Sequence, residues 1–515
     1  MSINEAPSED GCPEGQTDGR IHGVRRQIAI VAVILLLCEL NAMAVAMLVP
    51  GLRPMAAEFP VEGLAWTITI VSLVGAMVMP LGGKLVDRFG QRPVVLTACA
   101  VFLVGSLISA LSSSFALMIV GRALQGTIAV MPVIAYRVFR DSLPPRVVPI
   151  ALGALGTGFG VSGLLAPVIG GAFVDGLGYR SIFWFFFAFT AVLAPLSVIV
   201  LPRTPRQRSA EVGRVDILGG LLLALGIGGI LLGLGQGDKW GWLAPLTLLV
   251  ILGGFIALGM FVLVESRVEE PMIDLRVLRN PAVALTLTVG LVGFMACGMM
   301  AIALPQMLQT PSSTGMMYAF GLSALMVGLA QIPFGITSMV FGPLGGLLTK
   351  RFNPRAIMIS SMASFAIGST LLALAHHSLV LVLVWLCVMG VGFGLFWAAQ
   401  PNLMVEAVPR KYTGVSGGIQ VCSVSISTAI ASAIVGAVLS SNVADVGPEG
   451  PLYNDAAFTT IFLVGAGSAV IALIISMFMR HGRQPATGGA ATDLELDVEG
   501  ATFARVGSAD GQGLA

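Results

Sequence analysis

The sequence has 515 residues and a net charge of +1; 56% of its residues are hydrophobic and only 11% are charged. A soluble globular protein carries roughly 25% charged residues, so this composition excludes a water-soluble chain and predicts that lipid surrounds most of it. The balanced charge gives no reason to expect a nucleic-acid partner. The six cysteines stand without the spacing of a zinc site or a disulfide framework.

Fourteen apolar runs follow one another along the chain. A helix needs about 20 mostly apolar residues to cross a bilayer, and each run is close to that length or longer. The sequence therefore predicts an all-α integral membrane protein with fourteen spans, at residues 26–49, 64–82, 93–112, 115–138, 148–174, 181–201, 215–235, 243–264, 282–307, 316–341, 356–376, 378–402, 413–440 and 457–479.

The distribution of basic residues predicts the orientation. Of the 28 Lys and Arg residues, 24 fall on segments that lie on one side if the N-terminus is cytoplasmic, three fall in the opposite loops, and Arg122 falls inside a span. Because cytoplasmic loops carry the excess of Lys and Arg, both termini are predicted to be cytoplasmic. Residues 1–19 contain five acids and no Lys or Arg, which argues against a signal peptide. We expect a multi-pass protein of the cytoplasmic membrane.

The order of spans and polar segments predicts five regions. Two bundles of six helices flank a linker that carries two extra transmembrane helices, and a polar tail precedes and follows them. The boundaries are residues 1–24 for a disordered cytoplasmic tail, 25–204 for the first bundle, 205–275 for the linker, 276–480 for the second bundle and 481–515 for a second disordered tail. We expect a monomer in the lipid bilayer.

One short phrase occurs in both bundles. Residues 80–89 read PLGGKLVDRF and residues 343–352 read PLGGLLTKRF. Two membrane halves built on one plan are typical of transporters, in which the halves rock about a single site.

Four motifs carry a family resemblance. They are the loop from Gly83 to Arg92, the Gly121-Arg122-Ala-Leu-Gln125-Gly126 segment, the glycine series from Gly156 to Gly171 with Ala166-Pro167, and the linker at 261–279. Together, in this order, the motifs resemble the major facilitator superfamily, and within it the fourteen-span drug:proton antiporter branch. The resemblance covers residues 26–480 and implies a fold of two six-helix bundles plus two helices, and export driven by protons.

Two positions depart from that branch. Asn41 stands where its members usually have an acid in the first span, and the acid of this span, Glu39, lies two residues earlier, about 200° around the helix. In the second-half loop Lys350 replaces the usual acid.

Glu39 and Arg122 are the predicted proton-coupling residues. A charged side chain in mid-membrane costs about 2.5–3.5 kcal/mol or more, so it normally faces the bundle interior and has a function. Glu39 is the one acidic candidate partner deep enough for Arg122. The alternatives are a permanently protonated Glu39 and an Arg122 that only donates to backbone carbonyls.

The first cytoplasmic loop is a predicted gate. Asp87 is expected to pair with an arginine at the inner end of the fourth span and to latch the halves together; the alternative is a loop whose basic residues only fix topology. The predicted gating residues are Gly83, Asp87, Arg88, Gly90, Arg92, Arg137 and Arg140.

The fifth span carries a predicted bend or rocking surface, because small residues let helices approach closely and proline disrupts helical bonding. The residues are Gly160, Gly163, Pro167, Gly170 and Gly171. Plain helix packing is the alternative.

The substrate is expected to be a lipophilic small molecule, neutral or singly cationic, because flexible and aromatic side chains suit loosely specified apolar ligands. If it is cationic, it would compete with the proton for Glu39. The predicted cavity residues are Asn41, Gln125, Met295, Met299, Phe393 and Trp397.

We therefore predict a proton-coupled exporter of drugs or dyes, with protons as coupling ion and with no other cofactor, metal or enzymatic site. The alternatives are a proton-coupled exporter of one endogenous metabolite, such as a siderophore, lipid or antibiotic, and a non-transporting membrane receptor or assembly partner. His376 and His377 are expected to be solvated residues of an outer loop.

Overall fold

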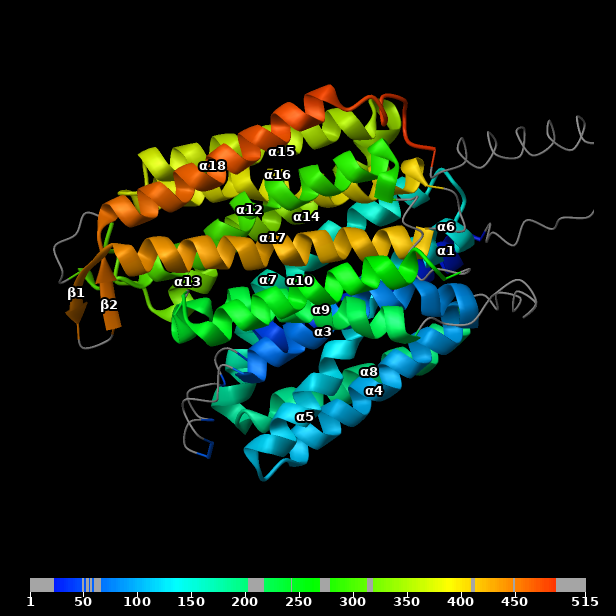
Figure 1. Ribbon diagram of the computed structural model, residues 1–515, viewed down its shortest axis with the longest axis horizontal. Helices are drawn as coiled ribbons and strands as arrows, with labels where there is room; N and C mark the ends of the chain where they lie inside the picture. The colour runs from blue at the N-terminus through cyan, green and yellow to red at the C-terminus, as the bar shows by residue number, and fades with distance from the viewer. Residues whose placement is uncertain are drawn as a thin grey trace, which may run out of the picture.

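Long helices that lie side by side make up almost the whole molecule (Figure 1). In this computed structural model the described residues are 23–48, 51, 55, 58–59, 66–201, 217–241, 243–268, 278–312, 318–408, 413–447 and 450–487. In Figure 1 the first half is coloured blue to cyan and the second half green to red, and helices α3 and α7 of the first half pack against α17 and α14 of the second.

The helices of the first half coincide with the predicted spans to within a few residues, apart from the fourth and the inner end of the second. The fourth predicted span consists of two α-helices joined by one 3-10 turn, just before Pro132, which lacks the N–H needed to continue an α-helix. The elements are α1 Val24–Ala46, α3 Trp66–Phe89, α4 Gln91–Leu111, α5 Phe115–Gly126, η3 Thr127–Val130, α6 Met131–Ser142, α7 Val148–Leu177 and α8 Arg180–Val200.

The linker pair and the second half follow. The tenth predicted span is also divided, at a turn around Gln331, with Pro333 in the first turn of the helix that continues. The elements are α9 Ile217–Trp240, α10 Pro245–Glu265, α12 Pro281–Gln309, α13 Ala324–Ala330, α14 Ile332–Arg351, α15 Pro354–Leu374, α16 Leu379–Ala407, α17 Thr413–Ser441, β1 Val443–Gly447, β2 Gly450–Tyr453 and α18 Asp455–Phe478. The two strands form one antiparallel hairpin.

Polar caps and glycines set where helices begin. The side chain of Ser114 accepts from Leu117 N at the start of α5, and the side chain of Asn353 accepts from Ala356 N at the start of α15, which satisfies amide donors that have no partner in the first turn. Gly90, one of the predicted gating residues, has φ of +83° between α3 and α4, a conformation that favours glycine.

Each half has its own hydrophobic core. Phe102, Phe183 and Phe186 are fully buried in the first, and Phe365 and Phe396 in the second. A smaller cluster connects α3 and α17 with the linker helix α9. The two halves are therefore separately packed bodies, as a rocking transporter requires.

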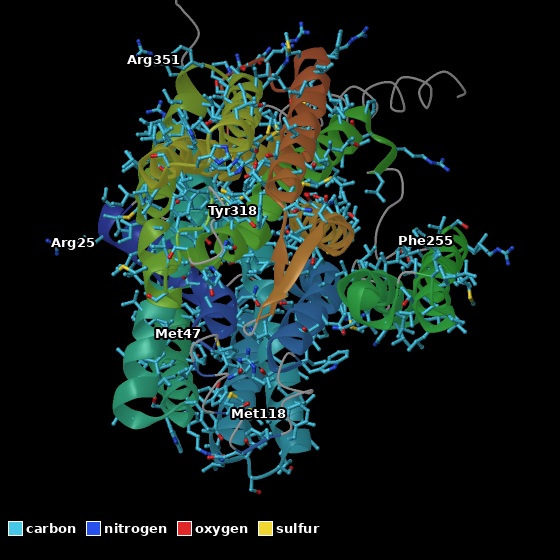
Figure 2. All side chains as sticks on the ribbon, turned by 90° about the vertical axis from the view of Figure 1, so that its left-hand side faces the viewer. Arg25, Met47, Met118, Phe255, Tyr318 and Arg351 are labelled. Carbon is cyan, nitrogen blue, oxygen red and sulfur yellow. The ribbon has the colours of Figure 1, made fainter. Side chains whose placement is uncertain are left out.

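Eleven helical segments among the described residues are long and apolar enough to cross a membrane, and Trp66–Met79 and Leu218–Leu234 are shorter apolar stretches. The all-helical membrane architecture is thus confirmed, while the count of fourteen spans and the cytoplasmic position of the termini stay predictions. Figure 2 shows that the linker pair stands out from the bundle at Phe255. This outer surface of α10 exposes Leu249, Leu252 and Phe255, a surface suited to lipid.

The repeated PLGG phrase marks close helix contacts in both halves. A β-carbon on Gly82 would overlap the side chain of Val130, and one on the equivalent Gly345 would lie 2.7 Å from the β-carbon of Ala398. The next glycine, Gly346, packs against the backbone of α7 at Pro149. The repeat therefore encodes tight packing of α3 on η3 and of α14 on α16 and α7.

Residues 480–487 follow α18 and lie against the second half. The Gly482 carbonyl accepts from Arg355 N at 3.1 Å, and the Thr487 amide donates to Glu406 Oε1 at 2.6 Å. His481 Nε2 lies 2.9 Å from the hydroxyl of Thr286. This part of the predicted second tail is bound to the ends of α12, α15 and α16; residues 1–22 and 488–515 lie outside the described part.

Candidate transport site

Glu39 is buried in α1 and faces α7. Its side chain is only 6% exposed, and Ser162 Oγ of α7 lies 2.5 Å from Glu39 Oε2 and donates to it. The other oxygen, Oε1, has no hydrogen-bond partner among the described residues. A buried carboxyl group with one bonded and one unbonded oxygen has capacity to hold a proton.

The glycines of α7 make room for this carboxyl group. A β-carbon at Gly158 would overlap Glu39 Oε1, and one at Gly170 would collide with the backbone of α1 at Met47. In contrast, a β-carbon at Gly171 meets nothing within 4 Å. The glycines at positions 158 and 170 therefore allow α1 to lie against α7.

Three motif residues, Gly160, Gly163 and Pro167, belong to α7, but their packing falls outside what the structure describes. Bending at these positions stays a prediction.

Arg122 is fully buried, and it bonds to carbonyl oxygens instead of to a carboxylate. Its Nε donates to Thr67 O at 2.7 Å and its Nη2 to Ala44 O at 2.7 Å. The expected pairing with Glu39 is not found, because Glu39 faces α7 while the guanidinium of α5 reaches α1 and α3 through their backbones. Arg122 thus fixes α1 five residues beyond Glu39.

Gln125 orients this guanidinium and is not among the residues that line the cavity described below. Its Oε1 accepts from Arg122 Nη1 at 2.6 Å, and its Nε2 donates to Ser106 Oγ of α4 at 2.8 Å. Its predicted substrate contact is therefore replaced by a contact inside the first half.

A cavity of about 400 Å³ lies where the two halves meet the linker pair. This volume suits a drug-sized ligand. The described residues that line it are Asn41 of α1; Thr69, Ser72, Leu73, Gly75, Ala76 and Met79 of α3; Ala129 of η3; Leu231, Leu232 and Gln236 of α9; Ile302 of α12; and Val424, Ser425, Thr428, Ala429 and Ser432 of α17.

Of the predicted cavity residues, Asn41 lines this cavity. Met299, Phe393 and Trp397 are packed into the core of the second half, and Met295 packs against that core. The reason is an aromatic cluster in which Phe393 lies 6.0 Å from Phe294 between ring centroids. These side chains fill the second bundle and do not face the cavity.

The proton site and the cavity lie on different sides of α1. Glu39 bonds α7 and does not line the cavity, whereas Asn41, two residues later, does. Two residues correspond to about 200° around a helix. Direct competition between proton and substrate for Glu39 therefore has no support in this geometry.

Backbone acceptors and side-chain donors join the halves at the end that is predicted to be cytoplasmic. Lys350 Nζ of α14 donates to Arg146 O at 2.6 Å, and Arg140 Nη1 of α6 donates to Val408 O at 3.0 Å. Lys350, the departure from the family's acid, thus bridges the halves.

A buried polar chain crosses between the halves nearby. The Tyr136 hydroxyl of α6 donates to Gln420 Oε1 of α17, and Gln420 Nε2 donates to Gln400 Oε1 of α16 at 3.0 Å. Asn402 Nδ2 donates to Pro149 O of α7 at 3.3 Å. These contacts hold the halves together at the end that is predicted to be cytoplasmic.

The predicted latch is described only in part. The surroundings of Gly83 and the side chain of Asp87 lie outside the described part of the chain. Arg137 pairs with Asp141 at 2.5 Å, one turn along α6, and Arg92 Nε donates to Leu201 O at 2.7 Å. The guanidinium carbon of Arg88 lies 5.5 Å from the ring centroid of Phe89. An Asp87 latch stays a prediction.

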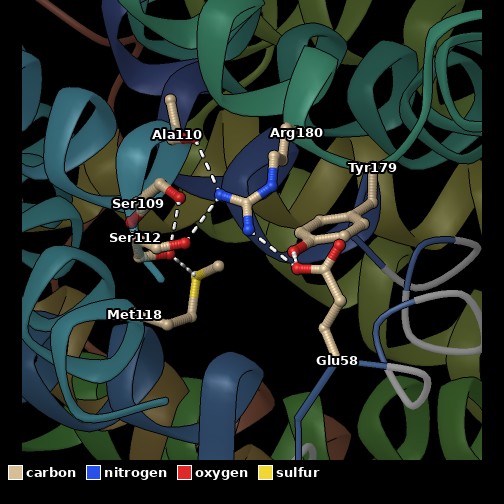
Figure 3. Close-up of polar contacts among 7 residues, drawn as sticks. All are labelled: Glu58, Ser109, Ala110, Ser112, Met118, Tyr179 and Arg180. Atoms are coloured by element: carbon tan, nitrogen blue, oxygen red, sulfur yellow. Dashed lines mark hydrogen bonds and ion pairs between the residues drawn. The ribbon is translucent and has the colours of Figure 1, made fainter. Parts of the chain in front are cut away.

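Loops at the opposite end are joined by Arg180 (Figure 3). Its guanidinium forms an ion pair with Glu58 at 2.7 Å and donates to Ala110 O and Ser112 O, while the Tyr179 hydroxyl donates to Glu58 Oε2 at 2.5 Å. The Tyr179 hydroxyl and then Arg180 hold the pKa of Glu58 below its ordinary value. Three loops predicted to be extracellular thus meet at one end.

The two adjacent histidines, His376 and His377, were both expected to be solvated, but they differ in burial. His377 is exposed, but His376 is fully buried. Its Nδ1 lies 2.8 Å from Leu372 O and its Nε2 lies 2.7 Å from Asp455 Oδ1. His376 is therefore a structural contact between α15 and α18, and the prediction that it is a solvated loop residue was wrong.

These features define a membrane transporter of two related halves, and comparison of sequences identifies its family. A sequence model described as Major Facilitator Superfamily matches residues 34–311 and 286–496. The chain belongs to the major facilitator superfamily. It is a multi-pass protein of the cell membrane and a transporter, not an enzyme.

Its relatives include proteins named for drug resistance. The chain is 28% identical to the multidrug resistance protein Stp of Mycobacterium tuberculosis over 74% of this chain and 69% of that one. It is 26% identical to the lincomycin resistance protein LmrB of Listeria innocua over 89% and 98%. It is 27% identical to the tetracenomycin C resistance and export protein of Streptomyces glaucescens over 81% and 76%. The predicted resemblance to drug exporters is confirmed.

Solved structures confirm the fold. The human organic anion transporter MFSD10 superposes with a TM-score of 0.62 at 16% identity, over 87% of this chain and 99% of that one. The proton:xylose symporter XylE superposes with a TM-score of 0.61 at 13% identity, over 91% and 99%.

The sequence reasoning missed Ser162 and Gln236. Ser162 is a polar residue inside the apolar run 148–174, and Gln236 directly follows the run 215–235; this is an available signal, because polar groups within a membrane normally need a partner. Their partners and the surfaces they face could not be read from the runs alone.

Proposed function

We propose that this protein exports lipophilic compounds across the cytoplasmic membrane in exchange for protons, by alternating access. Its relatives named for multidrug, lincomycin and tetracenomycin C resistance support drug efflux. The observation that carries proton exchange is Glu39, a buried carboxyl group of α1 with one oxygen bonded to Ser162 of α7 and the other unbonded.

The proposed role of Glu39 is to hold α1 against α7 in one protonation state and to release it in the other. An uncharged carboxyl group is tolerated in the apolar contact, whereas a carboxylate with one donor is costly there. Loss of the proton therefore favours a conformation in which water reaches Glu39. A proton that moves through 100 mV supplies about 2.3 kcal/mol, which is enough for more than tenfold accumulation at 1.4 kcal/mol per factor of ten.

Arg122 gives α1 a second attachment. It donates to Ala44 O of α1 and to Thr67 O of α3, and α1 and α3 both line the cavity. A change at Glu39 is thus transmitted along α1 to the cavity wall through backbone contacts. Coupling in this proposal is indirect, through one shared helix.

The test uses everted membrane vesicles with an acidic lumen. Uptake of ethidium and of radiolabelled chloramphenicol is compared for the unchanged protein and for Glu39→Gln, at matched protein amounts. We expect gradient-driven uptake of at least one probe, and its loss in the variant. Uptake that persists in Glu39→Gln would place the proton site elsewhere, and the absence of gradient-driven uptake by the unchanged protein would contradict drug:proton exchange.

A second candidate is dedicated export of one endogenous compound, which the resemblance to a resistance and export protein of Streptomyces glaucescens supports. The two candidate functions differ in how many unrelated compounds inhibit transport. A drug exporter is inhibited by many unrelated lipophiles, and a dedicated exporter by few.

A further inference from the structure

The linker pair supplies part of the cavity wall. Helix α9 packs against both α3 of the first half and α17 of the second, and three of its residues, Leu231, Leu232 and Gln236, line the cavity. Helix α10 packs on the far side of α9, where it carries the exposed Phe255 seen in Figure 2. The pair therefore covers the side of the cavity that the two halves leave between α3 and α17.

The described residues that line this cavity include no Asp, Glu, Lys, Arg or His. The polar groups are amides and hydroxyls on an otherwise aliphatic wall. A cation that enters a low-dielectric site without a carboxylate loses hydration without compensation, so this wall favours an uncharged ligand.

Two of the polar groups on the cavity wall are side-chain amides, which can bond a ligand. Asn41 Oδ1 is buried without a partner. Gln236 is 5% exposed and lines the same cavity. A buried polar group left unpaired costs about 1–3 kcal/mol, and an unpaired group in a native structure calls for an explanation such as a ligand. The two come from different elements, α1 and α9, on the wall of one cavity.

We propose that α9 is part of the substrate site, and that Gln236 and Asn41 select uncharged lipophilic compounds that carry hydroxyl or carbonyl groups. The aliphatic residues of α3, α9 and α17 hold the apolar body of the substrate. The two amides bond its polar groups. This inference rests on the proposed export function and narrows its substrate class.

The experiment measures binding directly, so it does not depend on a proton gradient. Purified protein in lipid nanodiscs is titrated with chloramphenicol and prednisolone, which are uncharged and hydroxylated, and with the cation ethidium. Gln236→Met keeps side-chain length and removes the amide. Gln331→Met is the matched control, because Gln331 lies at the junction of α13 and α14 and does not line the cavity.

We expect at least one uncharged probe to bind more tightly than ethidium. Gln236→Met should weaken that binding about tenfold, the loss of one hydrogen bond of about 1.4 kcal/mol, and Gln331→Met should leave it within twofold. Unchanged affinity in Gln236→Met would overturn the role of α9, and tighter binding of ethidium, or no binding of either uncharged probe, would overturn the substrate class. Failure of proton-driven uptake with these affinities intact would instead count against the proposed exchange alone.

Discussion

Glu39 and Gly158 form a contact that only a glycine allows. The carboxyl group of α1 occupies the space that a β-carbon of residue 158 would need, and Ser162, one turn further along α7, donates to it. The sequence predicted a functional Glu39 and a functional glycine series, but as separate features. Their contact could not be predicted, because residues 119 positions apart give no local signal of proximity.

The first prediction concerns this contact. Gly158→Ala should lower gradient-driven export at least tenfold, because the added methyl group displaces the Glu39 carboxyl group, and overpacking typically costs about 1–3 kcal/mol. Gly171→Ala on the same helix should keep export within twofold, since nothing lies within 4 Å of its β-carbon. Uptake rates in everted vesicles, normalised to protein amount, provide the measurement. Equal rates for the two variants would argue against a proton site packed on α7.

At the scale of elements, the segment that follows α18 has a predicted pH dependence. Burial, and then the charge of Arg355, lower the pKa of His481 to about 4, so the docked imidazole is neutral above that pH. A free histidine has a pKa of about 6.5. Undocking therefore binds a proton, and the stability of the docked segment is full above about pH 6.5 and is lost as the pH falls towards 4.

Hydrogen exchange measures this effect. The amides of Ala486 and Thr487, which bond Thr349 O and Glu406, should be protected at pH 7.5 and exchange faster at pH 4.5, after correction for the intrinsic pH dependence. His481→Gln should remove the difference between the two pH values. Equal corrected protection at both pH values in the unchanged protein would show that His481 does not control docking.

The elements show where sequence reasoning succeeds. Apolar runs of membrane length predicted nearly every helix, because the backbone of a segment in lipid must form its hydrogen bonds within the segment. The breaks before Pro132 and around Gln331 were missed, since apolar composition continues through both. Of the predicted cavity residues, Met299, Phe393 and Trp397 lie in the core of the second half, and composition alone does not separate a ligand pocket from a bundle core.

For the whole molecule, the two halves and the linker pair pack together, and the halves are joined at the end that is predicted to be cytoplasmic. Cross-half contacts such as Lys350 to Arg146 and Tyr136 to Gln420 make this connection, and the cavity lies between α3, α9 and α17. The repeated PLGG phrase predicted the two halves, but not that α9 would complete the cavity. That role depends on contacts with both halves, which hydropathy does not encode.

The central claim is that proton and substrate bind on different sides of α1. The most direct test is the equilibrium dissociation constant of Glu39→Gln for whichever of chloramphenicol, prednisolone and ethidium the unchanged protein binds most tightly, measured in nanodiscs beside proton-driven uptake in vesicles. We predict a dissociation constant within threefold of the unchanged protein, together with uptake reduced to background. A dissociation constant raised tenfold or more would place Glu39 in the substrate site and contradict indirect coupling.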